Sequence, residues 1–278
     1  MKKIGIVLVT YNPDIKVLYR TVDELNKKNL IYIFDNGSKN ADEIRNVLSE
    51  LKNVHILFNS RNLGIAEAQN NTIKRILENY HCSFLFFLDQ DSYIAESVLE
   101  QLVFDYNKCK EIYPKIACIA AVSKFASKNL NERYELASEV ISSGMLIPVE
   151  SIKSIGLMKA DFFIDMVDYE WCWRAIDKGW TIIQDNKCLF THQIGDSENK
   201  VLNKVLIAPF RLYYVYRNSI YILKNFSYGK NKEIKYKLFK QFIFNCVFCP
   251  QKKQRFKYII LGIKDGMKNR LGKLEYER

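Results

Sequence analysis

Several patterns that would assign this chain to a common class are absent from its sequence. No stretch of about eighteen residues is apolar throughout, and the apolar stretch from Ile4 to Val9 is too short for a secretory signal or a membrane span. No GxGxxG follows this stretch, which argues against a dinucleotide-dependent oxidoreductase. No internal repeat or low-complexity segment is present. These absences predict a globular, cytoplasmic protein.

The cysteines do not suggest a disulfide framework. Their number, seven, is odd, and most of them stand in apolar stretches, which favours reduced thiols in the core. Cys246 and Cys249 have CxxC spacing, but no second pair and no nearby histidine accompanies them. We therefore expect no zinc or redox site there.

The positive charge of the chain is concentrated at its C-terminal end. The sequence has 278 residues, of which 48% are hydrophobic and 26% charged, enough for one large domain or for a domain with a helical appendage. Residues 201–278 hold 18 lysines and arginines against 4 acids, whereas the first 200 residues hold 24 against 27. A basic segment of this kind indicates a surface that meets phosphate groups.

The same C-terminal segment is rich in aromatic residues and has a helical pattern. The segment from Pro209 to Arg278 mixes Phe and Tyr with Lys and Arg, which favours the interface of an anionic membrane over nucleic acid. A helical bundle packed on the rest of the protein, with solvated charges, is the alternative. We predict a catalytic domain at 1–202 and a helical, basic extension at 203–278.

The first half of the chain has the pattern of βα units around a mainly parallel sheet, because short apolar runs alternate with longer amphipathic ones. The predicted strands are Lys3–Thr10, Leu30–Phe34, Val54–Phe58, Ser83–Leu88 and Ile116–Ala121, and the predicted helices are Ile15–Lys28, Ala41–Leu51, Ile65–Tyr80 and Ala95–Lys108. A further strand is expected at Val140–Pro148 and a helix at Tyr169–Lys178.

Polar residues follow most of these strands, at the sheet edge where ligands of such folds bind. Asp89, Gln90 and Asp91 come directly after an apolar strand, and two carboxylates at this spacing suit Mg²⁺ or Mn²⁺ held together with substrate phosphates. A helix N-cap with a spare acid is the alternative for Asp91. Asp35 and Asn36 offer donors and acceptors for a base or ribose, or form a turn.

Two further segments carry candidate site residues. Arg61, Asn62, Gly64 and Ala66 lie just before or at the start of a helix, whose exposed N–H groups favour phosphate. Asp165, Asp168 and Glu170 are crowded among apolar residues, where burial would raise a carboxyl pKa and suit a general base. Glu170 is four residues from Arg174, so a helix would pair them and leave Asp168 or Asp165 as the base.

His192 follows a strand-like stretch and is one of three histidines. Its imidazole could complete a metal shell or contact a diphosphate, although a lone histidine is more often a packing or surface residue.

Taken in order, these segments resemble the family 2 inverting glycosyltransferases of the GT-A fold, and most closely their rhamnosyltransferase-like bacterial branch. The resemblance covers roughly residues 3 to 220. Each motif is weak alone, and the ordered set is specific. It rests on Val9-Thr10-Tyr11-Asn12, Asp35-Asn36-Gly37-Ser38, Asn62-Leu63-Gly64-Ile65-Ala66, Asp89-Gln90-Asp91-Ser92, Ser143-Gly144, Phe163 to Trp171, His192 and Arg217-Asn218.

The resemblance implies roles for most of these segments. The residues that would bind the donor are Thr10, Tyr11, Asn12, Asp35, Asn36, Arg61, Asn62, Gly64, Ala66, Asp89 and Gln90. The metal would be held by Asp91, Asp89 and His192. The acceptor side would be formed by Ser143, Gly144 and Trp171. Asp168 aligns with the base of the family, and Glu170 and Arg174 would belong to the catalytic group beside it. The family often has Glu-Asp where this chain has Val167-Asp168, which keeps Asp165 as a rival.

The implied activity is an inverting, metal-dependent transfer of a sugar, with L-rhamnose from dTDP-L-rhamnose as the leading donor, to a glycan or lipid-linked acceptor in bacterial surface polysaccharide synthesis. A UDP-hexose or UDP-galactofuranose transferase would need the same pocket. We expect a peripheral location on the inner face of the cell membrane and no nucleic-acid partner, and the sequence leaves a homodimer open. A non-catalytic protein that binds sugar nucleotide or nucleic acid is the alternative of another class. A nucleotidyltransferase is disfavoured, because Thr10 to Pro13 is not a Gly/Arg/Lys-rich loop.

Overall fold

The computed structural model describes residues 4–124, 132–192, 200–201, 204–228 and 230–275. Among these residues, nine strands form one mixed sheet. Four parallel strands come first, in the order β3 (Val54–Phe58), β2 (Leu30–Asp35), β1 (Ile4–Thr10) and β4 (Phe84–Asp89). The sheet continues through β8 (Met145–Pro148), antiparallel to β4, and then β6 (Ile116–Ser123) and β9 (Thr181–His192). The short strands β5 (Ser92–Tyr93) and β7 (Tyr134–Leu136) pair with β9.

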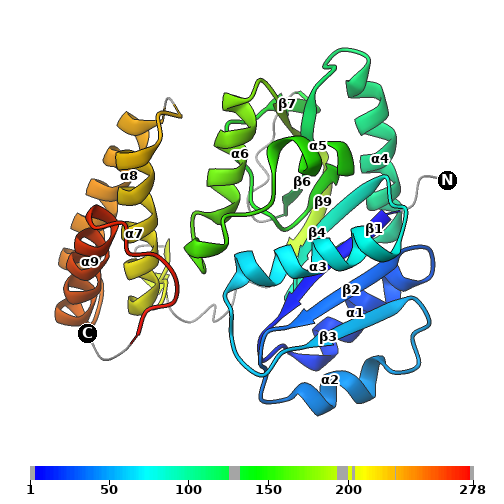
Figure 1. Ribbon diagram of the computed structural model, residues 1–278, viewed down its shortest axis with the longest axis horizontal. Coiled ribbons are helices and arrows are strands. Elements are labelled where there is room, and N and C mark those ends of the chain that lie inside the picture. Colours follow the sequence, from blue (N-terminus) through cyan, green and yellow to red (C-terminus); the bar gives the residue numbers. More distant parts are fainter. Residues whose placement is uncertain (1–3, 125–131, 193–199, 202–203, 229, 276–278) are drawn as a thin grey trace.

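Helices cover both faces of this sheet (Figure 1). One face packs on α3 (Ile65–Asn79), α5 (Val149–Ile155) and α6 (Val167–Asp177), and the other packs on α1 (Ile15–Asn26), α2 (Ala41–Leu48) and α4 (Glu96–Lys110). Alternate side chains of a strand point to opposite faces, so Val7 joins the core under α3 whereas Ile6 and Leu8 join the core over α1. The predicted α/β fold with a mainly parallel sheet is confirmed.

One predicted strand is much shorter than expected. Only Met145–Pro148 of the range 140–148 is a strand, because Gly144 has a φ of +89° and the chain turns at Ser142 to Gly144. A Cβ at Gly144 would lie 3.0 Å from the ring of Phe190, so glycine is required there by both space and φ. The turn brings Ser142 to the edge of the sheet where β4 ends.

The C-terminal part of the chain is a group of helices beside the sheet, as Figure 1 shows in yellow to red. The antiparallel pair of β10 (Lys200–Val201) and β11 (Lys204–Val205) precedes α7 (Pro209–Asn225), α8 (Asn231–Ile243), a π-helical turn η2 (Phe244–Phe248) and α9 (Lys252–Met267). α7 and α9 pack closely because Gly262 and Gly266 have no side chain. A Cβ at Gly262 would come within 2.4 Å of the Tyr213 carbonyl oxygen. No helix in the described part of the chain is long and apolar enough to span a membrane.

Candidate active site

A pocket of about 1050 Å³ lies between the carboxyl ends of β1, β2 and β4 and the C-terminal helices. Its floor is made by strand ends and the first turns of α3 and α6, and its far wall by α7, α8 and η2. The short helix η1 (Ala160–Phe162) leads into the loop that runs along one side. The helical extension is therefore part of this pocket.

Asp89, Gln90 and Asp91 line the floor of the pocket, as predicted from their place after β4. Gln90 ties two strand ends together, because its Oε1 accepts from the Tyr11 amide at 2.7 Å and its Nε2 donates to the Tyr11 carbonyl at 3.3 Å. The Asp89 amide donates to Ser143 Oγ at 3.2 Å. Two carboxylates two residues apart on the pocket floor supply hard oxygen donors, so the residues present fit a Mg²⁺ or Mn²⁺ ion.

The predicted donor residues divide into pocket residues and supports. Tyr11, Asn36, Asn62 and Gly64 line the pocket with Asp89 and Gln90. Asn36 holds the segment before α3, because its Nδ2 donates to Gly64 O at 3.2 Å and its Oδ1 accepts from Leu63 N at 2.8 Å.

Asp35 is fully buried beneath this surface and acts on the loops around it. Thr10 Oγ1 donates to its Oδ1 at 2.9 Å, and the Ser38 amide donates to its Oδ2 at 3.0 Å. Asn12 in turn connects to Ser38 and Lys39. The structure thus places Thr10, Asn12 and Asp35 outside the pocket lining, together with exposed Arg61 and buried Ala66. They support the pocket from the side or from below.

Gln69, on α3, is a pocket residue that the sequence reasoning missed. It is 4% exposed, and its Oε1 has no hydrogen-bond partner among the described residues. A buried acceptor without a partner costs about 1–3 kcal/mol. A substrate hydroxyl or N–H in the pocket would satisfy it.

Asp168 stands in the first turn of α6 and lines the pocket. Its Oδ1 accepts from the Tyr169 amide at 3.0 Å and its Oδ2 from the Ser142 amide at 3.2 Å. Burial raises the pKa of Asp168 to about 6, against the lowering effect of those two amides and with a further rise from nearby Asp89. A carboxyl with this pKa is suited to accept a proton near neutral pH.

The loop before α6 has an unusual backbone. Phe163, Asp165 and Met166 all have positive φ, between 63° and 64°, although none is glycine. At Phe163 the ψ of −65° and the hydrogen bond from Ile164 N to Phe162 O, 2.7 Å, define the rare, strained form of the γ-turn. Each such residue costs on the order of 1–3 kcal/mol and persists only where its surroundings impose it.

Asp165, the rival base, also lines the pocket, and it is paired with Arg211 of α7. Arg211 Nη2 lies 2.6 Å from Asp165 Oδ1, and Nε lies 3.2 Å from Oδ2. Arg211 was not predicted, since 46 residues separate the two side chains in the sequence.

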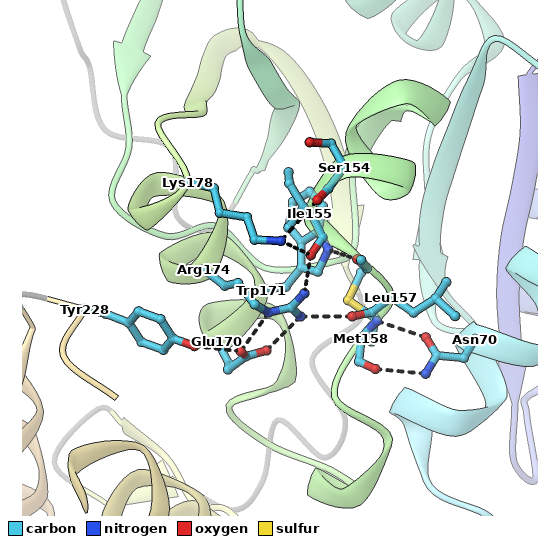
Figure 2. A network of polar contacts seen from close by, with 11 residues as sticks. Asn70, Ser154, Ile155, Leu157, Met158, Glu170, Trp171, Arg174, Lys178 and Tyr228 are labelled. Atoms are coloured by element: carbon cyan, nitrogen blue, oxygen red, sulfur yellow. Dashed lines mark hydrogen bonds and ion pairs between the residues drawn. The ribbon is translucent and has the colours of Figure 1, made fainter. Parts of the chain in front are cut away.

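Glu170 and Arg174 were predicted beside the base, but they do not line the pocket. They form an ion pair of 2.9 Å, with Glu170 buried, and Arg174 also donates to the carbonyls of Ile155 and Leu157 (Figure 2). Residues two apart on a helix point to opposite sides, so Glu170 faces away from Asp168. Tyr228 donates to Glu170 at 3.1 Å, which joins this pair to the helical extension.

The predicted acceptor residues are also beneath the surface. Trp171 is fully buried and donates through Nε1 to Gly156 O at 2.9 Å (Figure 2), and Ser143 Oγ donates to Ser92 Oγ at 2.9 Å. Tyr169 and Trp173 line the pocket instead. Neither Ser143 nor Gly144 lines it. The backbone of His192 pairs with Ser92, next to Asp91, and the side chain of His192 lies outside the described part of the structure.

A second acidic group lies away from the pocket. Asp105, Asp185 and Cys188 are buried, with their ligand atoms within 4.8 Å of one another. Arg133 forms ion pairs with both carboxylates, and Tyr134 donates to Asp105 at 2.6 Å. A guanidinium therefore already supplies the positive charge that a metal would bring.

The pocket combines the strand-end carboxylates Asp89 and Asp91 with the partly buried carboxylate of Asp168, and the comparison with known families agrees with this arrangement. Residues 5–163, more than half of the chain, match the family described as Glycosyl transferase family 2. The chain belongs to this glycosyltransferase family. The dTDP-rhamnosyl transferase RfbF of Shigella flexneri is 31% identical to it, over 78% of this chain and 79% of that relative.

Solved glycosyltransferases share the fold of this family 2 protein. TarS of S. aureus, residues 1–349 in complex with UDP-GlcNAc, has a TM-score of 0.57 at 14% identity and covers 96% of this chain and 81% of its own. The mannosyltransferase PcManGT from Pyrobaculum calidifontis, in complex with GDP-Man and Mn²⁺, has a TM-score of 0.58 at 11% identity and covers 96% and 75%. The GT-A fold is confirmed, and the protein is a nucleotide-sugar glycosyltransferase.

Proposed function

We propose that this protein transfers L-rhamnose from dTDP-L-rhamnose to a hydroxyl of a glycan or lipid-linked acceptor in bacterial surface polysaccharide synthesis. The similarity to a dTDP-rhamnosyl transferase over most of both chains carries the choice of sugar. The pocket supports a transfer reaction, because it joins the strand-end carboxylates Asp89 and Asp91 to the proton acceptor Asp168.

In this proposal Asp168 is the general base. It takes the proton of the acceptor hydroxyl as the acceptor oxygen forms a bond to the anomeric carbon of the sugar. The bond from that carbon to the diphosphate oxygen breaks on the opposite face, and dTDP leaves with the electron pair. A single displacement of this kind inverts the anomeric configuration.

Asp91, with Asp89 directly or through water, would hold Mg²⁺ or Mn²⁺. A bound divalent cation supplies neutralisation of the charge that develops on the leaving diphosphate. Tyr11, Asn36 and Asn62 lie on the same strand-end side of the pocket, where they would bind the nucleotide.

A donor panel tests the proposal. The purified protein is incubated with Mn²⁺, a bacterial lipid extract as acceptor source, and dTDP-L-rhamnose, UDP-glucose or UDP-galactofuranose, and free nucleoside diphosphate is measured. We expect release of dTDP at least about tenfold faster than release of UDP. Faster release of UDP than of dTDP would show that a UDP-sugar is the donor. No release of nucleoside diphosphate from any of the three donors would favour a non-catalytic protein.

We also propose that residues 1–202 form the catalytic domain and that the extension, residues 203–278, docks on an anionic membrane. We infer that the exposed apolar and basic side chains of α8, η2 and α9 form one docking surface, here called the aromatic–basic face. Its members include Tyr236, Phe239, Phe248, Phe256, Ile260, Lys240, Lys253 and Lys257. Aromatic groups at the headgroup level and lysines near anionic lipid both favour binding, the lysines by about 1 kcal/mol each.

Vesicle sedimentation tests this docking. We expect more binding to vesicles that contain phosphatidylglycerol than to pure phosphatidylcholine at low salt, and weaker binding after Phe239→Ser with Phe248→Ser. Phe104→Ser is the matched control, because Phe104 is 65% exposed on α4, outside the aromatic–basic face. Equal binding to both vesicle types would contradict the proposal.

A further inference from the structure

The strained loop at 163–166 is held by two buried residues of α7 to which the reaction itself assigns no role. Asn218 and Arg217 are both fully buried. They stand in the middle of α7, which belongs to the helical extension, whereas the loop belongs to the segment that carries Asp165 and Asp168.

Asn218 binds the loop through its backbone. Its Nδ2 lies 3.1 Å from Phe162 O, 3.0 Å from Ile164 O and 2.8 Å from Asp165 O. Phe162 and Ile164 are the two ends of the γ-turn, and Asp165 is the next residue of positive φ. One amide group thus holds together the carbonyls that this backbone conformation turns to the same side.

Arg217 sets the orientation of that amide. Its Nε donates to Asn218 Oδ1 at 2.9 Å, so the Nδ2 of Asn218 must face the loop. Its Nη2 donates to Phe162 O at 2.8 Å and to Asp161 O at 3.2 Å, and its Nη1 donates to Gly272 O.

From the opposite side, the Ile65 amide of α3 donates to Phe163 O at 2.6 Å. The loop is therefore fixed between α3 and α7 just before α6 begins, and Asp168 follows in the first turn of α6.

We propose that Asn218, oriented by Arg217, is a positioning residue that holds the loop 161–168 in the conformation in which Asp168 faces the pocket. This inference rests on the proposed role of Asp168 as base. It makes the helical extension a requirement for chemistry, in addition to any docking.

Kinetics and hydrogen exchange on Asn218→Ala test the proposal. We expect kcat to fall by at least about tenfold while the KM for the donor changes by less than about threefold, since the proposed nucleotide contacts lie on strand ends. Without substrate, the amides of 161–168 should exchange at least about tenfold faster, and those of α7 and α9 should not. Asn225→Ala is the matched control, because Asn225 is an exposed residue of the same helix that bonds only Tyr221 O and Asn269 Oδ1 among the described residues.

Arg217→Lys provides a second variant, which keeps the charge and loses the bond to Asn218 Oδ1. If Asn218→Ala does not fold, the same criteria apply to Arg217→Lys. Unchanged exchange at 161–168, exchange that rises equally across α7 and α9, or faster loop exchange with an unchanged kcat would each overturn the proposal. The exchange measurement needs no turnover, so a failure of the proposed donor would not hide a failure of the positioning role.

Discussion

Arg211 donates two hydrogen bonds to the carboxylate of Asp165, from Nη2 at 2.6 Å and from Nε at 3.2 Å. A bidentate guanidinium occupies both oxygens of a carboxylate. Among the described residues, Asp168 accepts hydrogen bonds from the backbone amides of Ser142 and Tyr169, and its pKa is raised to about 6. The two aspartates lie in one pocket, and the geometry favours Asp168 as the base.

Asp165→Asn should therefore lower the stability of the fold and have only a small effect on kcat. We expect kcat to stay within about tenfold of the parent. Loss of a partly buried bidentate pair should lower the free energy of unfolding by about 1–2 kcal/mol and Tm by roughly 2–6 °C. Asp161→Asn, at an exposed position four residues earlier, is the control and should change neither quantity. A loss of kcat beyond about a thousandfold in Asp165→Asn would return Asp165 to the role of base.

The pH dependence of kcat should report Asp168. The base must be ionised, so we expect kcat to decline as the pH falls through about 6, with a tenfold loss for each further unit. A decline of kcat near pH 4, the ordinary pKa range of an aspartate, would show that the pKa of Asp168 is not raised by its surroundings.

The raised pKa of Asp168 also means that its ionised carboxylate lowers the free energy of unfolding at neutral pH. Because the folded protein holds the Asp168 proton more tightly than the unfolded chain, this carboxyl destabilises the fold as the pH rises from about 4 through about 6. The Tm of Asp168→Asn relative to the parent should therefore increase over that pH range. A difference independent of pH would show that the pKa of Asp168 is not raised.

Gln69→Leu should weaken binding of the donor and increase the stability of the fold. The substitution removes a buried oxygen without a partner among the described residues, so we expect a gain of about 1 kcal/mol in unfolding free energy, measured by denaturant titration. If Gln69 accepts a hydrogen bond from the donor, the KM for dTDP-L-rhamnose should rise about fivefold to tenfold. A loss of stability would show that the Gln69 amide has a structural partner.

Glu170→Gln should mainly destabilise. Removal of one charge from the buried pair with Arg174 is expected to cost about 3 kcal/mol and to lower Tm by roughly 6–12 °C, with kcat of the folded fraction within about threefold. Glu233→Gln is the matched control, because Glu233 forms an exposed pair with Lys230. A large kcat effect without a Tm effect would restore the predicted catalytic role of Glu170.

The sequence predicted the sheet and its polar edge because both follow from local patterns. Apolar runs marked β1 and β4, and the parallel order brought Tyr11, Asn36 and Asp89 to one edge. Which of the polar side chains reach the pocket depends on side-chain direction, which is why Asp35 and Trp171 were placed at the surface but are buried.

Three features of the site had no local signal in the sequence. The pair of Arg211 with Asp165 joins residues far apart in the chain. Phe163 and Met166 have positive φ although neither is glycine, so the residue types at these positions did not predict this backbone conformation. That Gln69 Oε1 has no hydrogen-bond partner in the described part of the chain depends on packing in three dimensions.

The most direct test of the central claim is the kcat of Asp168→Asn with dTDP-L-rhamnose, measured as dTDP release beside the parent and Asp165→Asn. We predict a fall of about 10²- to 10⁴-fold for Asp168→Asn, with Asp165→Asn within about tenfold of the parent. Parent-like turnover by Asp168→Asn, with Tm retained, would contradict the assignment of Asp168 as the base.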